Sequence, residues 1–186
     1  MTSTQMVISA AMRLVERVKA IMLRPSSEWP MIEKEPSTLT GLLLGYVAIL
    51  AAIPELSHLI GQSLIGAAHA PIGSNLLRAV IVYLVTFAMV YIIAGVIDLL
   101  APRFGGRKNF PNAVKLSVYS HTPLWLAGIF LLIPGLNFLL ILGVYGFYLL
   151  WVGLPLLMRV RNDRALPYAL FITACALVPA VVLSLV

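Results

Sequence analysis

The sequence predicts an all-α, polytopic integral membrane protein with five transmembrane helices, preceded by an amphipathic cytoplasmic helix. Hydrophobic residues make up 61% of the 186 positions and charged residues only 11%, against about 25% charged in soluble domains. Five apolar runs approach the roughly 20 residues that a helix needs to cross a bilayer. Since the loops between them are short, we expect two regions: a cytoplasmic helix and connector over residues 1–37, and a transmembrane domain over residues 38–186.

Residues 6–24 predict the amphipathic helix. Its apolar side chains recur at spacings of four and three residues: Val7, Ala11, Leu14, Val18 and Ile21. Because the other faces are largely basic, we expect the helix to lie on an anionic membrane surface. Packing against the protein's own cytoplasmic loops is the alternative. Residues 25–36 form a connector in which Trp29 is of the type that settles at headgroup level.

The distribution of Lys and Arg predicts the orientation of the five spans. The predicted spans are residues 38–60, 75–101, 112–133, 135–158 and 166–186. Twelve of the 13 basic residues fall on one side of the membrane: Arg13, Arg17, Lys19, Arg24, Lys34, Arg103, Arg107, Lys108, Lys115, Arg159, Arg161 and Arg164. Only Arg78 falls on the other side. Because Lys and Arg are enriched in cytoplasmic loops, the amino terminus is expected in the cytoplasm and the carboxyl terminus outside.

Signatures of an enzyme or of a nucleic-acid-binding protein are missing from the sequence. It has no phosphate-binding loop and no His-Glu-x-x-His pair, and residues 61–66 are one residue too long for a nucleophile elbow. Cys175 is the single cysteine, so an internal disulfide or a cysteine zinc cluster is excluded. The positive charges flank the apolar spans, as is typical of a membrane protein. We therefore expect no catalytic residues, no cofactor and no nucleic acid.

The first span contains a carboxylate and an imidazole on adjacent helical turns, Glu55 and His58. This Glu-x-x-His spacing can ligate a metal or relay a proton. Arg78 on the second span lies at a similar depth, so an ion pair between Glu55 and Arg78 is the alternative. Both interpretations stay open at this point.

Further polar residues lie at other depths of the predicted bundle. His121 falls close to the midplane, next to the helix-breaking Pro123, whereas Asp98 lies near the cytoplasmic boundary, where Lys115 could neutralise it. The residues that could line a polar route are Glu55, His58, Asp98, Tyr119 and His121, and the metal candidates among them are Glu55, His58 and His121. The remaining histidine is His69, so a histidine-rich metal cage is excluded.

Small residues on the last two spans predict close helix packing. Gly143, Gly146 and Gly153 share one face of the fourth span. The expected partner is a stripe of small residues on the fifth span: Ala169, Thr173, Ala176 and Ala180. Alternatively, one of the two stripes forms a contact between copies of the chain.

Three segments carry a resemblance to a known family: PSSEWPMIEKE at 25–35, Ala113 through YSHTP at 119–123, and GVYGFYLLWVGLP at 143–155. In this order and placement they resemble the Yip1 domain family of small five-span membrane proteins, in the short form of its bacterial inner-membrane members. The resemblance implies the fold and a bacterial inner-membrane location, with a periplasmic carboxyl terminus. The family's eukaryotic link to vesicle trafficking and Rab GTPases does not carry over to a bacterium.

The expected function is therefore that of an integral membrane adaptor or scaffold. It would self-associate as a homo-oligomer, or bind other membrane proteins or membrane lipids. The alternative is a small transporter or channel for a metal ion or protons, which would use the Glu, His and Asp residues inside the membrane.

Overall fold

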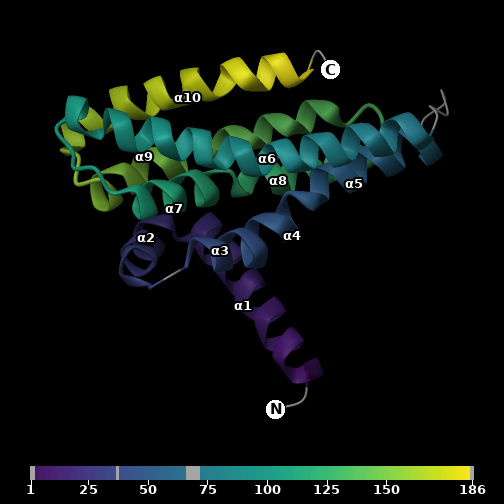
Figure 1. Cartoon of the computed structure of the whole chain (residues 1–186), viewed down its shortest axis with the longest axis horizontal. Coiled ribbons are helices and arrows are strands. Elements are labelled where there is room, and N and C mark those ends of the chain that lie inside the picture. Colours follow the sequence, from purple (N-terminus) through teal and green to yellow (C-terminus); the bar gives the residue numbers. More distant parts are fainter. Residues whose placement is uncertain (1–2, 37, 66–71, 185–186) are drawn as a thin grey trace.

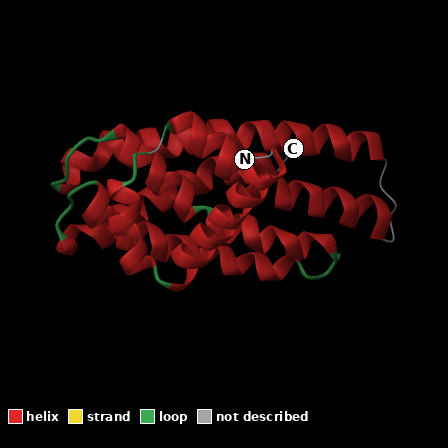
Figure 2. Ribbon diagram, turned by 90° about the horizontal axis from the view of Figure 1, so that it is seen from below, coloured by secondary structure: helices red, strands yellow, loops and turns green. Residues whose placement is uncertain are grey.

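The computed structural model describes residues 3–36, 38–65 and 72–184. Most helices lie roughly along the long axis of one bundle, whereas the first helix diverges from it (Figure 1). Helices joined by short loops make up the described chain, and no β-strand occurs in it (Figure 2). The all-helical fold class is thus confirmed.

The amino-terminal region forms α1 (Ser3–Leu23) and α2 (Pro25–Lys34). The first long helical segment follows: α3 (Leu39–Leu42), η1 (Leu43–Val47), α4 (Ala48–Leu50), α5 (Ala52–Ile60) and η2 (Gly61–Ile65), of which η1 and η2 are π-helical turns. The second is α6 (Ile72–Leu100), extended by the 3₁₀ turn η3 (Ala101–Phe104). The remaining elements are α7 (Phe110–Ser120), α8 (Thr122–Ala127), η4 (Gly128–Leu132), η5 (Asn137–Val144), α9 (Tyr145–Leu157) and α10 (Asn162–Ser184).

Three of the helical segments are long and apolar enough to cross a membrane: Leu39–Ser63, Ile72–Phe104 and Asn137–Leu157. They coincide with the predicted spans at 38–60, 75–101 and 135–158. Of the other two predicted spans, the one at 166–186 is helical over its described residues and the one at 112–133 is helical except at His121 and Ile133, but neither is among these candidates. The count of five spans therefore stays a prediction.

The predicted span at 112–133 is interrupted at His121. Pro123 lacks an amide hydrogen and its ring excludes the preceding turn, so α7 ends at Ser120 and α8 begins at Thr122. The eleven residues of α7 extend only about 16 Å, which is too short for a bilayer crossing. The turns of α8 and η4 continue the path beyond this break.

The core of the bundle is centred on α7, in which every residue from Ala113 to Ser120 is buried. It packs against both α6 and α9. The hydroxyl of Ser117 donates to the carbonyl oxygen of Val90 (2.9 Å) and so joins α7 to α6. Tyr168, which is fully buried on α10, donates its hydroxyl to the carbonyl of Ile97 on α6.

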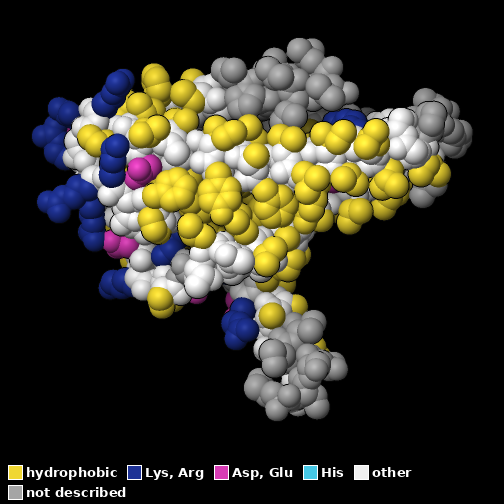
Figure 3. All heavy atoms as spheres, in the orientation of Figure 1, with side chains coloured by type: hydrophobic (Ala, Val, Ile, Leu, Met, Phe, Trp, Pro, Cys, Tyr) yellow, Lys and Arg dark blue, Asp and Glu magenta, His cyan; other side chains and the backbone are white. Residues whose placement is uncertain are grey.

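Charged and apolar side chains separate on the surface. Lys and Arg gather at one end of the bundle, and apolar side chains cover the helices beyond them (Figure 3). On α6 the exposed apolar residues are Ile72, Leu76, Leu77, Val80, Ile81, Leu84, Tyr91, Ile92 and Leu99. Such a continuous apolar surface suits lipid and would be a liability in water.

Candidate functional site at the amino-terminal end of the bundle

The helix α2 forms because its ends carry the right residues. Pro25 occupies its first position, Glu28 lies in its first turn and Lys34 in its last, each of which favours a helix at that place. Glu35 is already extended, as expected for a residue that precedes a proline. The helix therefore stops just before Pro36.

Trp29 attaches α2 to the bundle. Its indole is fully buried and packs edge-on against the ring of Tyr119, with the ring centroids 6.1 Å apart. A Cβ at Gly153 would lie 2.7 Å from Trp29 Cε2 and 2.6 Å from Leu116 Cδ2, so the indole fits only because residue 153 is glycine. The connector is thus a helix, and it buries Trp29 in the protein core instead of presenting the side chain at the surface.

Lys115 holds the carboxyl-terminal end of α2. Its Nζ donates to the carbonyl oxygens of Ile32 (2.8 Å), Glu35 (2.8 Å) and Glu33 (3.4 Å). The last carbonyls of a helix have no partners within it and carry partial negative charge, so a buried ammonium group is well placed there.

The expected neutralisation of Asp98 by Lys115 is therefore wrong. Asp98 Oδ1 is buried without a hydrogen-bond partner in the described part of the chain. The prediction compared only the depths of the two residues in the bundle. The carbonyl groups at the end of α2 offer the ammonium group three acceptors, where Asp98 would have offered one carboxylate.

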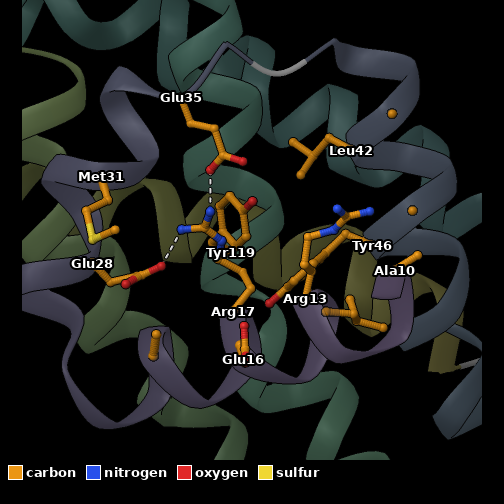
Figure 4. A pocket seen from close by; sticks show the side chains of 14 residues that line it. Ala10, Arg13, Glu16, Arg17, Glu28, Met31, Glu35, Leu42, Tyr46 and Tyr119 are labelled. Atoms are coloured by element: carbon orange, nitrogen blue, oxygen red, sulfur yellow. Dashed lines mark hydrogen bonds and ion pairs between the residues drawn. The ribbon is translucent and has the colours of Figure 1, made fainter. Parts of the chain in front are cut away.

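Ion pairs tie α1 to α2 and its end, and tie α2 to the loop after α9. Arg17 on α1 pairs with both Glu28 and Glu35 (Figure 4). Arg159 pairs with Glu33 at 2.5 Å, and the hydroxyl of Tyr145 on α9 donates to the carbonyl of Met22 (2.9 Å). The carboxyl-terminal half of α1 is thereby fixed to the bundle.

A cavity of about 560 Å³ opens beside these contacts, between α1, α2, the first long helical segment and α7. We call it the amino-terminal cavity. Its charged lining consists of Arg13, Glu16, Arg17, Glu28 and Glu35 (Figure 4). Tyr46 and Tyr119 supply aromatic lining, with their ring centroids 4.8 Å apart. Charged and aromatic groups in this combination suit the polar part of a lipid or protein at a membrane surface.

The part of α1 that precedes Arg17 leaves apolar side chains uncovered. Ile8, Met12 and Val15 are 53%, 56% and 53% exposed and lie on one side of the helix, at spacings of four and three. We call these three residues the α1 stripe. In Figure 1 this part of α1 extends away from the bundle, so α1 is anchored at one end and presents an apolar surface at the other.

The ion pair considered between Glu55 and Arg78 is present. Arg78 Nη1 lies 3.9 Å from Glu55 Oε2 and 3.4 Å from His58 Nδ1, so one guanidinium group faces both predicted polar residues. Glu55 Oε2 is buried without a hydrogen-bond partner in the described residues. The three side chains join α5 to α6.

The candidates for a polar route lie in separate places. Tyr119 lines the amino-terminal cavity, Glu55 lies between α5 and α6, and His121 lines a different cavity near α10. Asp98 lines none of these three. Within the described ranges, no three His, Cys, Asp or Glu side chains lie close enough together to hold a metal ion. His69 lies outside the described residues.

The glycines of the fourth span pack mainly against α7, α8 and α2. A Cβ at Gly143 would lie 2.7 Å from Leu124 Cδ1, and one at Gly146 would lie 2.3 Å from the Ser120 carbonyl oxygen. Gly153 faces Leu116 and Trp29 as described above. The expected partner of this face, the small-residue stripe of α10, is not what these glycines meet, although α9 and α10 do contact each other.

On α10 the residues of the predicted stripe have different surroundings. Ala169 is fully buried and its carbonyl accepts the hydroxyl of Thr173 (2.9 Å). Thr173 and Ala176 line the cavity near His121. The side chain of Ala180 lies outside the described part.

Two features were not predicted from the sequence: the carboxylate partners of Arg17 at the amino-terminal cavity, and the unpartnered hydroxyl of Ser120, which lines the separate cavity near His121. No helical spacing predicts the first, because Glu28 lies on α2 whereas Glu35 is extended beyond the end of that helix. Nothing in the sequence distinguishes Ser120, whose buried hydroxyl is unpartnered among the described residues, from the neighbouring Ser117, whose hydroxyl is bonded.

Comparison with known proteins identifies the family to which the chain belongs. The model of the Yip1 domain matches residues 19–183. The chain is similar to the inner membrane protein YohC of Escherichia coli strain K12 and to its counterpart in strain CFT073, each 26% identical over 166 residues, which cover 83% of this chain and 85% of the relative. No solved structure matches the chain.

Proposed function

Because the chain belongs to the Yip1 domain family, we propose that it is an integral inner-membrane adaptor that self-associates or binds other membrane proteins or lipids. A multi-pass place in the inner membrane is supported by the apolar helices and by the inner-membrane relative. We further propose five crossings, with the amino terminus in the cytoplasm and the carboxyl terminus in the periplasm.

The observation that carries the adaptor proposal is the unequal anchoring of α1. Its last turns are held by Arg17, by the bond to Met22 and by the fully buried Ile21. Its first turns expose the α1 stripe. A helix fixed at one end and apolar at the other is suited to lie along the membrane surface, where it can meet a second copy of the chain or another membrane protein.

The transport alternative has less support. A conducted route needs polar groups at successive depths in one continuous space. Here Glu55 and His58 are engaged with Arg78, and His121 and Tyr119 line different cavities. We therefore interpret the polar residues between α5 and α6 as a structural ion pair.

Photo-crosslinking in living cells tests the adaptor proposal. A benzoylphenylalanine at Met12, in the α1 stripe, is expected to give a discrete protein adduct, whose mass identifies either a second copy of the chain or another membrane protein. The matched control is the adjacent Arg13, which points to another side of the helix and is expected to give no such adduct. Adducts with lipid alone at Met12 would contradict self-association and protein binding through α1 and leave only lipid binding, and the same protein adducts from both positions would contradict a role of the α1 stripe.

A further inference from the structure

A second cavity, of about 470 Å³, lies between α7, α8, η5, α9 and α10. We call it the His121 cavity. Its volume falls within the roughly 300–1,000 Å³ of small-molecule sites. Leu124, Ile141 and Leu177 lie at its exposed edge, with 44%, 65% and 58% of their surface accessible. An apolar molecule could therefore enter from the bilayer.

Ser120 is the unusual residue of this cavity. Its side chain is 8% exposed, and its Oγ has no hydrogen-bond partner within the described chain. An unpaired buried hydroxyl costs free energy, because it has given up its bonds to water. The two other hydroxyl groups of the lining are already bonded, Ser117 to the carbonyl of Val90 and Thr173 to that of Ala169. Ser120 therefore provides a donor that is free for a ligand.

His121 supplies an acceptor in the same lining. Its Nδ1 lies 2.6 Å from the carbonyl oxygen of Ser117, and since a carbonyl only accepts, Nδ1 carries the proton. In the neutral ring Nε2 is then an acceptor. The cavity thus combines a hydroxyl donor and an imidazole acceptor from adjacent residues, surrounded by apolar side chains.

We propose that the His121 cavity binds a single-chain membrane alcohol, an alkyl or isoprenoid chain that ends in a hydroxyl group. The ligand hydroxyl accepts a hydrogen bond from Ser120 and donates one to His121, while its chain fills the apolar lining. A hydroxyl suits the site better than a charged headgroup, since the lining offers no cation or anion to pair with a charge. The proposed adaptor role depends on α1, whereas ligand binding depends on the His121 cavity. Each proposal can therefore be contradicted without affecting the other.

Tryptophan fluorescence provides the test. Trp125 lies beside His121, with ring centroids 5.9 Å apart and 4% of its surface exposed. The full chain carrying Trp151→Phe, which removes the lipid-exposed indole, is placed in phosphatidylcholine vesicles and titrated with 2-bromohexadecan-1-ol. We expect saturable quenching by the alcohol and only weak, non-saturating quenching by 2-bromohexadecane. Displacement by hexadecan-1-ol or by geranylgeraniol then shows whether an alkyl or an isoprenoid chain fits better.

Two serine variants make the test specific. Ser120→Ala is expected to weaken binding of the bromoalcohol about fivefold, which corresponds to one hydrogen bond. Ser117→Ala, in the same lining, should leave binding within about twofold. In the absence of ligand, the melting temperature should show the opposite pattern. Ser120→Ala should keep or raise the melting temperature, because it removes an unpaired buried group. Ser117→Ala should lower it, because it removes a hydrogen bond.

Three results would overturn the proposal. The first is equal quenching by the alcohol and the alkane, and the second is unchanged binding in Ser120→Ala. The third is a failure of both alcohols to displace the probe. The melting temperatures show in each case whether a variant is folded.

Discussion

Replacing Gly146 by valine is expected to destabilise the protein by about 3 kcal/mol or more, the upper end of the range for overpacked interiors. A Cβ at this position would lie 2.3 Å from the carbonyl oxygen of Ser120. That oxygen belongs to the backbone of the most buried helix, so it cannot move aside as a flexible side chain would. Thermal unfolding in detergent measures the loss.

Gly95 provides the matched control for this substitution. It lies within the predicted second span, and a Cβ there meets no atom within 4 Å. Gly95→Val should stay within about 1 kcal/mol of the unmodified protein, since valine is a better helix former than glycine. Similar losses at the two positions would mean that the close approach of α9 to α7 does not determine stability.

Trp29→Ala is expected to cost about 3–5 kcal/mol, as for other large-to-small changes of buried aromatic residues. The substitution leaves a cavity beside Tyr119, whose ring packs edge-on against the indole, and beside Gly153, where a Cβ would collide with the indole. Because the indole attaches α2 to α7 and α9, the amides of α2 should also exchange with solvent much faster. Hydrogen exchange measured by mass spectrometry reports this local change beside the global melting temperature.

Trp151 is the control for the tryptophan substitution, since 39% of its surface is exposed. Trp151→Ala should cost clearly less and leave the exchange of α2 unchanged. If both variants lose the same stability, or if α2 stays protected in Trp29→Ala, then α2 is not held to the bundle by this side chain.

Local features of the sequence were enough to predict α6 and the ion pair on it. The unbroken apolar run of α6 is long and carries few charges, so only a membrane-length helix accommodates it. Glu55 and Arg78 lie at equal depth on helices that are adjacent in the chain, and adjacent helices usually pack together. Equal depth on helices that are adjacent in the chain was therefore enough to propose this pair.

The depth of a residue in the bundle was not enough to predict the partners of Lys115 or of the glycines of the fourth span. Lys115 and Asp98 do lie near the same end of the bundle, but the direction in which each side chain points depends on how α7 is rotated against α2 and α6. For the glycine face of the fourth span, the sequence predicted either the small-residue stripe of the fifth span or a second copy of the chain. The neighbours it meets, α7, α8 and α2, depend on the break at His121 and on the docking of Trp29, both of which are properties of the assembled bundle.

The docked position of α2 also bears on the proposed adaptor role. With Trp29 buried and the end of α2 bound by Lys115, the direction of α1 relative to the bundle is fixed at its carboxyl-terminal end. The α1 stripe would thereby lie at a defined height against the membrane. Any change that releases α2 should weaken the contacts made by α1, even though Trp29 itself is far from the stripe in sequence.

The adaptor proposal depends most directly on the orientation of the chain, and cysteine labelling measures it. In a Cys175→Ala background, single cysteines are placed at Lys108, at Asn137 and after Val186, and intact cells are treated with a maleimide that does not cross membranes. Five crossings with a cytoplasmic amino terminus predict labelling at Asn137→Cys and at the added carboxyl-terminal cysteine, and labelling of Lys108→Cys only after the cells are permeabilised. Labelling of Lys108→Cys in intact cells would contradict this arrangement, because α1 would then not lie on the cytoplasmic surface. Protection of the carboxyl-terminal cysteine would also contradict it, because the fifth span would then not cross the membrane.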